Sequence, residues 1–459
     1  MAASKRKRRQ RGKQDPPPVG GGWGPRVLVA AGLFVFCLVA YLINGRTLPL
    51  RQGGDTIPNR LLPFAVLAHG TLTLDPFVDD LAAAGIVKPW YTREVGGSTV
   101  SLYPPGTGLV ALPLFVAPYH WLKATGRADD AELLAASEGL EKVAAAVIAA
   151  ASVVVTYLAA RRLASPSGAM WIGLGLGLGT SIWATASQML WQHGVVALAI
   201  AAGLLLLGHP DRPSWTLAAA GLVFGVGAMT RPSAALMLAA AVAWVALRSP
   251  LRTAAVELAW LLSGAVPPLL ATALYNQRYF DNFLGAYGLM KGAVDLRRAP
   301  LGLAGLLVSP NRGLLVFTPI ALLGIYGLVR CAWKPSGTGL GIFGIAAILH
   351  GVLSGAYYQW AGGWSFGPRY LVDVLPILAL GAALVWRSLG GAWKWALAGA
   401  LLWSVAVQLD GSFCYPASNW NQRMLRASSL ERAAWSWDHF ELWQDYEVWR
   451  RGDGTATPW

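Results

Sequence analysis

Charged residues and cysteine are both scarce in this sequence of 459 residues. Asp, Glu, Lys and Arg together make up only 13% of the chain, whereas soluble domains contain about 25%. Hydrophobic residues make up 55%, which excludes an ordinary soluble domain and is typical of a polytopic membrane protein. The cysteines, Cys37, Cys331 and Cys414, are far apart, which excludes a disulfide framework and a CxxC metal site.

Acidic residues are fewer than basic ones, 23 against 37, and the net charge is +14. Much of the excess lies near the N-terminus, at Lys5, Arg6, Lys7, Arg8, Arg9, Arg11 and Lys13. A basic run directly before an apolar segment is typical of a cytoplasmic arm that contacts anionic lipid. We therefore interpret 1–26 as such an arm and not as a nucleic-acid-binding segment. The apolar segment at 27–43 lacks a small-residue cleavage site, so we predict a retained first span.

Apolar segments occupy most of the remaining chain. A bilayer core of about 30 Å needs roughly 20 apolar residues per helix, and we predict about eleven membrane-spanning helices. The predicted spans are 27–44, 143–160, 169–187, 193–208, 215–230, 232–247, 255–274, 314–332, 338–356, 370–386 and 395–409. The predicted fold class is an all-α polytopic membrane protein with a long first extracytoplasmic loop that carries juxtamembrane helices.

The distribution of Lys and Arg indicates the orientation of these spans. With the N-terminus in the cytoplasm, every predicted inner loop is short and contains Lys or Arg, namely 161–162, 211–212, 248–252, 330–334 and 387–394. This arrangement obeys the positive-inside rule. The apolar segment 106–122 contains two prolines, and if it crossed the membrane, Arg161 and Arg162 would lie outside. We therefore predict that 106–122 is re-entrant or interfacial.

This topology places the long polar segments on the outer face. They are a first loop at 45–142, a second loop at 275–313, a turn at 357–369 and a Trp-rich extracytoplasmic tail at 410–459. Loops longer than about 15 residues are usually functional or disordered, and these are not of low complexity. We predict that the transmembrane domain, 27–409, carries its function on these outer loops. For the tail we favour anchoring in lipid headgroups over stacking on sugars, because Trp prefers the membrane interface.

An acid, Asp55, follows the first span closely. Asp55 and Pro58 fit the start of a helix, where an acidic side chain caps free N–H groups, so one interpretation makes Asp55 only a cap. The other makes it a general base at the outer face. We expect the helix after Asp55 to lie on the membrane surface. Its predicted lipid-facing residues are Leu61, Leu62, Ala65, Leu67 and Ala68, and its predicted water-facing residues are Asn59, Arg60 and His69. Further acids in this loop are Asp75, Asp79 and Asp80.

Basic and aromatic residues of the outer face are candidates for binding a phosphate or a sugar. Arg231 lies between two apolar segments, where an arginine is costly unless it is functional or reaches the headgroups. Arg312 begins a predicted span, and Arg369 follows a Gly- and Trp-rich turn, where its planar donors suit a phosphate. His193 is weighed as a general base against a structural hydrogen-bonding residue. The remaining candidates are Lys88, Tyr103 and Trp364.

Several short motifs give the sequence a resemblance to a known class. They are Gly54-Asp55, His69-Gly-Thr-Leu-Thr-Leu-Asp75, Tyr103-Pro-Pro-Gly, Thr230-Arg-Pro, Asn311-Arg-Gly with Thr318-Pro, and Trp360-Ala-Gly-Gly-Trp-Ser-Phe-Gly-Pro-Arg-Tyr370. With them the chain, from the first span to about Trp386, resembles the GT-C class of polytopic glycosyltransferases, which use polyprenyl-phosphate-linked sugars as donors. It looks most similar to bacterial relatives of protein mannosyltransferases and aminoarabinose transferases.

The resemblance implies roles for the candidate residues. Asp55 would deprotonate or orient the acceptor nucleophile, a group on a glycan, lipid or protein, which attacks the anomeric carbon with inversion. The leaving lipid phosphate would be stabilised by Arg231, Arg312 and Arg369, or by a divalent cation. Many members of the class have a paired acid at this position, whereas Asp55 has Gly54 and Thr56 as neighbours. The sequence therefore leaves open whether a metal takes part.

The alternative function is a non-enzymatic transporter or scaffold for a lipid or polysaccharide. The sequence has no P-loop and no dinucleotide-binding glycine motif, which fits a donor that is not nucleotide-activated. It has no visible internal repeat, which argues against an inverted-repeat transporter, and the interiors of its predicted spans carry almost no charge. These observations favour an enzyme of the bacterial cytoplasmic membrane.

Overall fold

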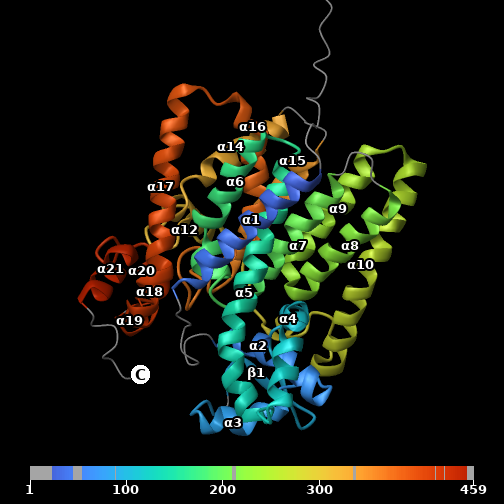
Figure 1. Cartoon of the computed structure of the whole chain (residues 1–459), viewed down its shortest axis with the longest axis vertical. Helices are drawn as coiled ribbons and strands as arrows, with labels where there is room; N and C mark the ends of the chain where they lie inside the picture. The colour runs from blue at the N-terminus through green and yellow to red at the C-terminus, as the bar shows by residue number, and fades with distance from the viewer. Residues whose placement is uncertain are drawn as a thin grey trace, which may run out of the picture.

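The computed structural model describes residues 23–44, 54–87, 89–208, 213–333, 338–418, 420–427 and 429–451. This described part is almost entirely helical (Figure 1), which confirms the predicted all-α class. Its strands, β1 (Thr92–Val95) and β2 (Ser98–Ser101), form one antiparallel hairpin. Gly96 and Gly97 turn this hairpin with positive φ angles of 56° and 83°, which glycine adopts without steric cost.

Each predicted apolar segment contains a helix of the structure. These helices are α1 (Trp23–Leu42), α5 (Asp130–Ala160), α6 (Pro166–Leu178), α7 (Gln192–Leu207), α8 (Ser214–Thr230), α9 (Ala235–Arg248), α10 (Leu251–Phe280), α14 (Ala321–Trp333), α15 (Leu340–Ala356), α16 (Leu375–Val385) and α17 (Gly391–Phe413).

Within the described part of the chain, length and apolar composition qualify five helical segments to cross a membrane. They are Gly24–Leu42, Asp130–Ala160, Leu251–Phe280, Arg369–Ser388 and Trp393–Phe413. The other apolar helices have 10–17 residues. The chain is therefore an integral membrane protein, while the number of about eleven spans stays a prediction.

Two glycines bring the backbones of α8 and α10 together. A Cβ on Gly221 would lie 1.8 Å from the carbonyl oxygen of Leu261, and a Cβ on Gly264 would lie 1.8 Å from that of Ala218. Small residues allow such close approach between membrane helices, where packing contributes more than escape from water. The two helices accordingly run side by side in Figure 1.

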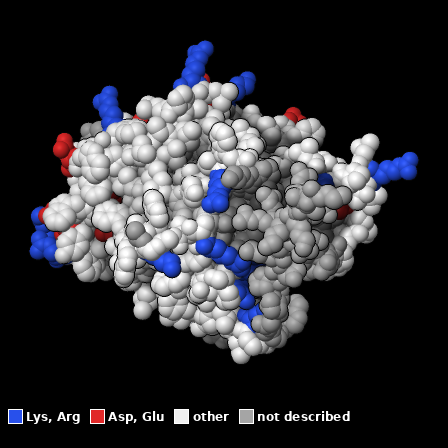
Figure 2. Space-filling model, turned by 90° about the horizontal axis from the view of Figure 1, so that it is seen from above, with Lys and Arg blue, Asp and Glu red and all other residues white. Residues whose placement is uncertain are grey.

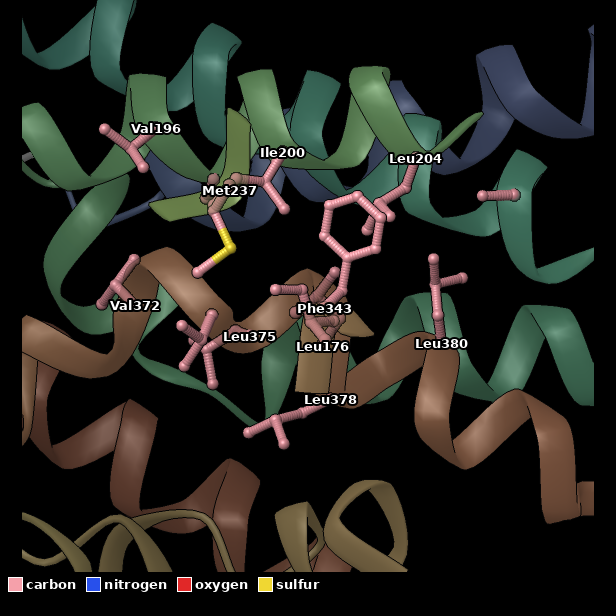
Figure 3. Packing of buried hydrophobic residues seen from close by; sticks show 14 of the residues in the cluster. Leu176, Val196, Ile200, Leu204, Met237, Phe343, Val372, Leu375, Leu378 and Leu380 are labelled. Carbon is pink, nitrogen blue, oxygen red and sulfur yellow. The ribbon is translucent and has the colours of Figure 1, made fainter. Parts of the chain in front are cut away.

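The largest apolar core joins α6, α7, α15 and α16 (Figure 3). Leu176, Ile200, Phe343 and Leu375 come from these helices and gather there. Phe343 also stacks on Phe224 of α8, with ring centroids 5.9 Å apart. This core fixes the relative positions of the helix ends on which the site residues described below are placed.

The helix that follows Asp55, α2 (Ile57–Phe64), lies inside the molecule and not on the membrane surface. Every residue of α2 is buried, because α4 (Gly106–Ala124) and α5 pack against it. Asn59 donates a hydrogen bond to the carbonyl oxygen of Leu190 at 2.8 Å, and Arg60 pairs with Glu141 at 2.9 Å. The predicted lipid-facing and water-facing sides of α2 are therefore wrong.

The rest of the first loop is built from short elements at the lower end of Figure 1. A π-helical turn at Ala65–His69 and a 3-10 turn at Asp75–Phe77 lead into α3 (Val78–Ala83). His69, expected to face water, pairs with Asp130 at the start of α5, Nε2 to Oδ1 2.7 Å. The segment 106–122 forms α4, but whether it enters the bilayer stays a prediction.

The second outer loop contains helices that the sequence did not predict. They are α11 (Ala286–Leu289) and α12 (Ala299–Val308), and α12 packs against α15. The predicted span 314–332 is also not one helix. α13 (Leu314–Phe317) ends at Phe317, and α14 begins at Ala321. Pro319 lies in this gap, and proline lacks the N–H that a continuous helix needs.

The C-terminal segment is folded against the helices. α18 (Tyr415–Ser418), α19 (Trp420–Ala427), α20 (Leu430–Ala434) and α21 (Glu441–Arg451) gather beside the lower end of α17 (Figure 1). Trp420 is completely buried, whereas Trp437 and Trp443 are 66% and 60% exposed. The tryptophans of this segment therefore serve two purposes, since some pack inside and others cover its surface.

Basic side chains mark the face at the top of Figure 1. Figure 2 shows this face from above, with Lys and Arg more numerous than Asp and Glu. The C-terminal ends of α5 and α14 and the N-terminal ends of α10 and α17 lie at this end, and the exposed basic residues at or next to these helix ends include Arg162, Arg252, Arg330 and Lys394. The first loop, at the opposite end, carries exposed acids such as Asp79.

Candidate active site

The carboxylate of Asp55 is paired with a residue from the far end of the chain. Its Oδ2 lies 3.0 Å from Nη1 of Arg369, with side-chain exposures of 20% and 7%. Asp55 precedes α2, and Arg369 opens the 3-10 helix Arg369–Val374, which continues into α16. The N-cap position of α2 is Thr56, and α2 has no side-chain cap hydrogen bond. Asp55 is therefore not the cap of this helix.

Aromatic rings hold the guanidinium of Arg369 in place. Its central carbon lies 4.5 Å from the ring centre of Trp191 and 5.2 Å from that of Tyr370. A cation over an aromatic face is attracted by the ring, most strongly where water is excluded. Nε of Arg369 is buried and has no hydrogen-bond partner among the described residues. Arg369 thus has a fixed position and a spare donor.

Two tyrosines complete the surroundings of Asp55. Burial holds the pKa of Tyr103 well above its usual range, and the negative charge of Asp55 is the second largest cause. Burial also raises the pKa of Tyr287 on α11, whose hydroxyl donates to Oε1 of Gln192 at 3.4 Å. Both phenols therefore stay protonated at neutral pH, and the one hydrogen of the Tyr287 hydroxyl is engaged by Gln192.

A second buried cluster supports the segment that carries Arg369. Asp373 accepts from Nη1 of Arg231 at 2.7 Å and lies 2.7 Å from Nδ1 of His193. Nε2 of His350 on α15 lies 2.9 Å from the carbonyl oxygen of Tyr370 and 3.4 Å from Oδ2 of Asp373, the oxygen that accepts from Arg231. Arg231 also lies 5.2 Å from the ring centre of Tyr370. The two clusters are therefore continuous through Tyr370.

The backbone at Arg231 explains how this residue reaches the cluster. α8 ends at Thr230, and Arg231 is extended, with φ −149° and ψ 120°. The 3-10 turn Pro232–Ala234 follows before α9 begins. The break between the two helices turns the side chain of Arg231 inward to Asp373. Asp373 was not singled out as a candidate from the sequence. The available signal was an acid near the start of the predicted span 370–386, where a charged residue is unusual.

A cavity adjoins this group of residues. The volume open to a water-sized molecule is about 20 Å³. It is lined by Ala184, Thr185, Gln188, Met189, Trp191, Ser365, Phe366, Gly411, Tyr415 and Pro416. Trp191 belongs both to the cavity wall and to the aromatic support of Arg369. The cavity therefore begins beside the Asp55–Arg369 pair.

Arg312 does not join this group. It is buried and pairs with Glu441 of α21, Nη1 to Oε2 2.5 Å. Its Nε donates to the carbonyl oxygen of Ala361 at 2.8 Å, and its central carbon lies 4.7 Å from the ring centre of Trp420. Its donors thus fasten the C-terminal segment to the loop before Arg369. A phosphate-binding role for Arg312 stays a prediction.

The remaining candidates are placed as follows. Lys88 lies outside the described residues. Trp364 is half-buried in the loop between α15 and Arg369. Asp75 accepts from the hydroxyl of Thr73 at 2.8 Å and from the N–H of Thr99, which ties this acid to the hairpin. Within the described ranges, no group of three or more His, Cys, Asp or Glu has an arrangement that would hold a metal ion.

Comparison with known proteins finds similarity in structure and not in sequence. No family model and no curated protein matches the chain. An oligosaccharyltransferase from Archaeoglobus fulgidus, solved in complex with Zn and sulfate, has a TM-score of 0.52 at 11% identity, over 84% of this chain and 53% of that one. This chain thus spans about half the length of that protein.

Two structures of ArnT from Cupriavidus metallidurans are also similar, at 16% identity over 94% of this chain. The one bound to undecaprenyl phosphate has a TM-score of 0.48 over 77% of that protein, and the apo one has a TM-score of 0.47 over 76%. Identities this low concern the fold alone. At that level the match to the oligosaccharyltransferase confirms the resemblance found in the sequence, and the chain has the fold of the GT-C class of membrane glycosyltransferases.

Proposed function

We propose that the protein transfers a sugar from a polyprenyl-phosphate-linked donor to an acceptor at the outer face of the bacterial cytoplasmic membrane. The acceptor is a glycan, a lipid or a protein. The observation that carries this proposal is the pairing of Asp55 with Arg369 at 3.0 Å. It joins the acid after the first helix to the Gly-Pro-Arg-Tyr motif, and these are two of the motifs on which the resemblance to the GT-C class rests.

In this proposal Asp55 is the catalytic base. The acceptor hydroxyl attacks the anomeric carbon, its proton passes to a carboxylate oxygen of Asp55, and the bond between that carbon and the phosphate oxygen breaks. The sugar configuration is inverted, because one displacement takes place. Arg369 engages Oδ2 of Asp55, so the other oxygen, Oδ1, is directed to the acceptor. Fixing the base in this way is how a site lowers a barrier by orientation.

The leaving phosphate needs positive charge and hydrogen-bond donors. Nε of Arg369 is buried and free of partners among the described residues, so it is the donor available to this charge. Fixed donors directed at developing charge stabilise a transition state. Arg231 supports the site indirectly. It pairs with Asp373 and lies over the ring of Tyr370, which in turn lies against the guanidinium of Arg369.

The membrane orientation belongs to the same proposal. The basic face of Figure 2 would be cytoplasmic by the positive-inside rule, which puts α2, α3 and α4 at the outer face. The N-terminus would then be cytoplasmic and the C-terminal segment extracytoplasmic. Sugars carried on polyprenyl phosphates would reach the site from the bilayer, and acceptors would reach it from outside.

The rival function, a non-enzymatic transporter, is less well supported. Transport sites usually place ionisable groups near the middle of spans, in discontinuous helices. Here the paired charges come from helix ends, since Asp55 precedes α2, Arg231 follows α8 and His193 begins α7.

The experiment is sugar transfer in proteoliposomes with a set of polyprenyl-phosphate sugars and acceptors from an envelope extract. We expect release of polyprenyl phosphate with at least one donor, and loss of that release in Asp55→Asn folded to the same extent. Asp79→Asn, which changes an exposed acid of the same loop, is the matched control. Equal release by wild type and Asp55→Asn would disprove the role of Asp55. If no donor reacts, the transferase function itself fails.

A further inference from the structure

The segment just before Arg369, residues 360–367, is rich in glycine, and we call it the glycine loop. The structure describes this whole loop and places none of it in a helix or strand. Gly362, Gly363 and Gly367 have positive φ angles of 85°, 59° and 59°. Glycine enters this region freely but loses more conformational freedom on folding than any other residue. A loop of this kind therefore needs contacts from other segments to hold one shape.

The glycine loop lies directly against the side chain of Arg369. A Cβ on Gly362 would lie 3.5 Å from Cγ of Arg369, and a Cβ on Gly363 would lie 3.7 Å from its Nη2. These are contact distances between packed groups. The backbone of the loop thus forms part of the wall around the guanidinium that pairs with Asp55. A shift of the loop would change the position of Arg369.

Residues of the C-terminal segment hold both ends of the glycine loop. At one end, Oε1 of Glu431 in α20 accepts from Nε1 of Trp360 at 3.1 Å. Toward the other end, the ring of Tyr415 in α18 packs against that of Phe366, with centroids 5.5 Å apart. The loop and these partners are far apart in the sequence, so the contacts form only when the C-terminal segment is docked.

Asn421 of α19 makes a further contact with the loop, and its amide group is fully used. Its Nδ2 donates to the carbonyl oxygen of Ser365 at 3.0 Å and to the hydroxyl of Tyr415 at 2.8 Å. Its Oδ1 accepts from Nη2 of Arg312, and Nε of Arg312 donates to the carbonyl oxygen of Ala361 at 2.8 Å. Asn421 is completely buried, where an unmade hydrogen bond is costly. Its orientation is therefore fixed, and with it the position of the loop carbonyl.

We propose that Asn421 is a positioning residue of the active site, and that the C-terminal segment holds the glycine loop in the shape that brings Arg369 to Asp55. The proposal rests on the proposed transferase function. It gives a catalytic purpose to a segment for which the sequence favoured contact with lipid headgroups. Asp55 carries out the chemical step, and Asn421 affects that step only through the position of Arg369. Loss of the contact should therefore lower the rate of transfer and not the binding of the donor.

The first test compares the kinetics of Asn421→Ala with those of wild type in proteoliposomes. A small misplacement of a reacting group lowers the rate strongly, so we expect kcat to fall about 10- to 100-fold, with the KM for the donor close to wild type. Met424→Ala is the control for lost stability, because Met424 is buried with Trp420 and Ala433 in a cluster of the C-terminal segment itself. It should lower the unfolding temperature and leave kcat close to wild type. An unchanged kcat in folded Asn421→Ala, or an equal loss in both variants, would overturn the proposal.

A double-mutant cycle tests whether Asn421 acts through Arg369. In Arg369→Gln no guanidinium is left to position, so adding Asn421→Ala should cause little further loss of kcat. A purely structural role would give the same fold-loss in both backgrounds, and that result would overturn the proposal. If Asn421→Ala folds poorly, Glu431→Ala takes its place in the cycle, because Glu431 is exposed and its removal leaves no buried cavity.

Hydrogen exchange of the full-length protein in detergent tests the hold on the loop without any substrate. The backbone amides of the glycine loop should exchange faster in Asn421→Ala and in Glu431→Ala than in wild type, and at the wild-type rate in Met424→Ala. Unchanged exchange in the folded variants would overturn the proposal even if wild type transfers sugar. If no donor reacts, the transferase function fails, and faster exchange would still support the hold of Asn421 on the loop. The two failures are therefore distinguishable.

Discussion

Asp55 and Arg369 are 314 positions apart in the sequence, yet Oδ2 of Asp55 lies 3.0 Å from Nη1 of Arg369. Asp55 is held by the buried helix α2, and Arg369 by the rings of Trp191 and Tyr370. The contact joins the residue before Thr56, the N-cap of α2, to the 3-10 helix that leads into α16. The pair therefore presents a carboxylate in a fixed direction.

Replacing Arg369 should lower the rate of transfer while the fold is kept. A hydrogen bond to a charged group contributes about 1.5–3 kcal/mol, so we expect Arg369→Gln to lose roughly 10- to 100-fold in kcat/KM. Arg369→Lys should recover only part of this loss, because an ammonium group lacks the planar fork of donors. Steady-state kinetics measures both variants. Activity of Arg369→Gln equal to wild type would show that the pair does not orient the base.

Arg312 should matter for stability and not for binding the donor. Arg312→Met leaves the carboxylate of Glu441 buried without its ion-pair partner, which costs about 3–5 kcal/mol in comparable cases. We expect a clear drop in the unfolding temperature and an unchanged KM for the donor in the protein that remains folded. Arg297→Met, at an exposed position of the second outer loop, is the control. A raised KM without loss of stability would place Arg312 at the substrate site.

The C-terminal segment should lose stability as the pH rises. Burial raises the pKa of Glu441 to about 7, against the attraction of Arg312, and burial next to Glu441 raises the pKa of Asp445 well above its usual range. A raised carboxyl pKa means that the folded state binds the proton more tightly than the unfolded state. Stability is therefore greatest below the unfolded value of 4.5 and falls as the pH rises through about 7.

Asp445→Asn tests this pH dependence. The substitution removes the acid of Asp445 and its repulsion of Glu441, and leaves Asp410 in place. We expect a flatter dependence of the unfolding temperature on pH than in wild type, measured by thermal unfolding in detergent. A wild-type unfolding temperature that rises between pH 4.5 and 7 would contradict the assigned direction of the Glu441 shift.

The contact between α8 and α10 should be intolerant of larger residues. A Cβ on Gly264 would lie 1.8 Å from the carbonyl oxygen of Ala218, so a side chain there forces the helices apart. Overpacking of this kind costs about 1–3 kcal/mol, and we expect Gly264→Val to lower the unfolding temperature. Gly399→Val is the control, because a Cβ at Gly399 of α17 meets no atom within 4 Å. Equal effects in the two variants would mean that the contact contributes nothing.

Hydropathy predicted the positions of the helices well, but not their detailed form. Apolar runs of sufficient length identify spans because the bilayer requires them. The break at Thr318 and Pro319 and the helix Ala299–Val308 were missed, since both depend on local packing. α2 was placed on the membrane surface because its pattern is amphipathic, whereas Arg60 is buried through its pairing with Glu141, a residue on another helix.

Some residues of the candidate site were singled out from the sequence, whereas their pairings were not predictable. Asp55, Tyr103, His193, Arg231 and Arg369 were singled out as unusual residues near span ends, and the structure brings them into one continuous group. Their roles stay proposals. Asp373 was not singled out, and Glu441 was not expected to pair with Arg312, because a single sequence does not reveal which distant charges meet.

The most direct test of the central claim is the single-turnover rate of Asp55→Asn at saturating donor and acceptor. Saturation removes differences in binding, so the rate reports the chemical step in which the base acts. We expect a loss of about 10²- to 10⁴-fold, with Asp79→Asn close to wild type. A single-turnover rate of folded Asp55→Asn within a few-fold of wild type would contradict the account, and Asp55 would then be a structural partner of Arg369.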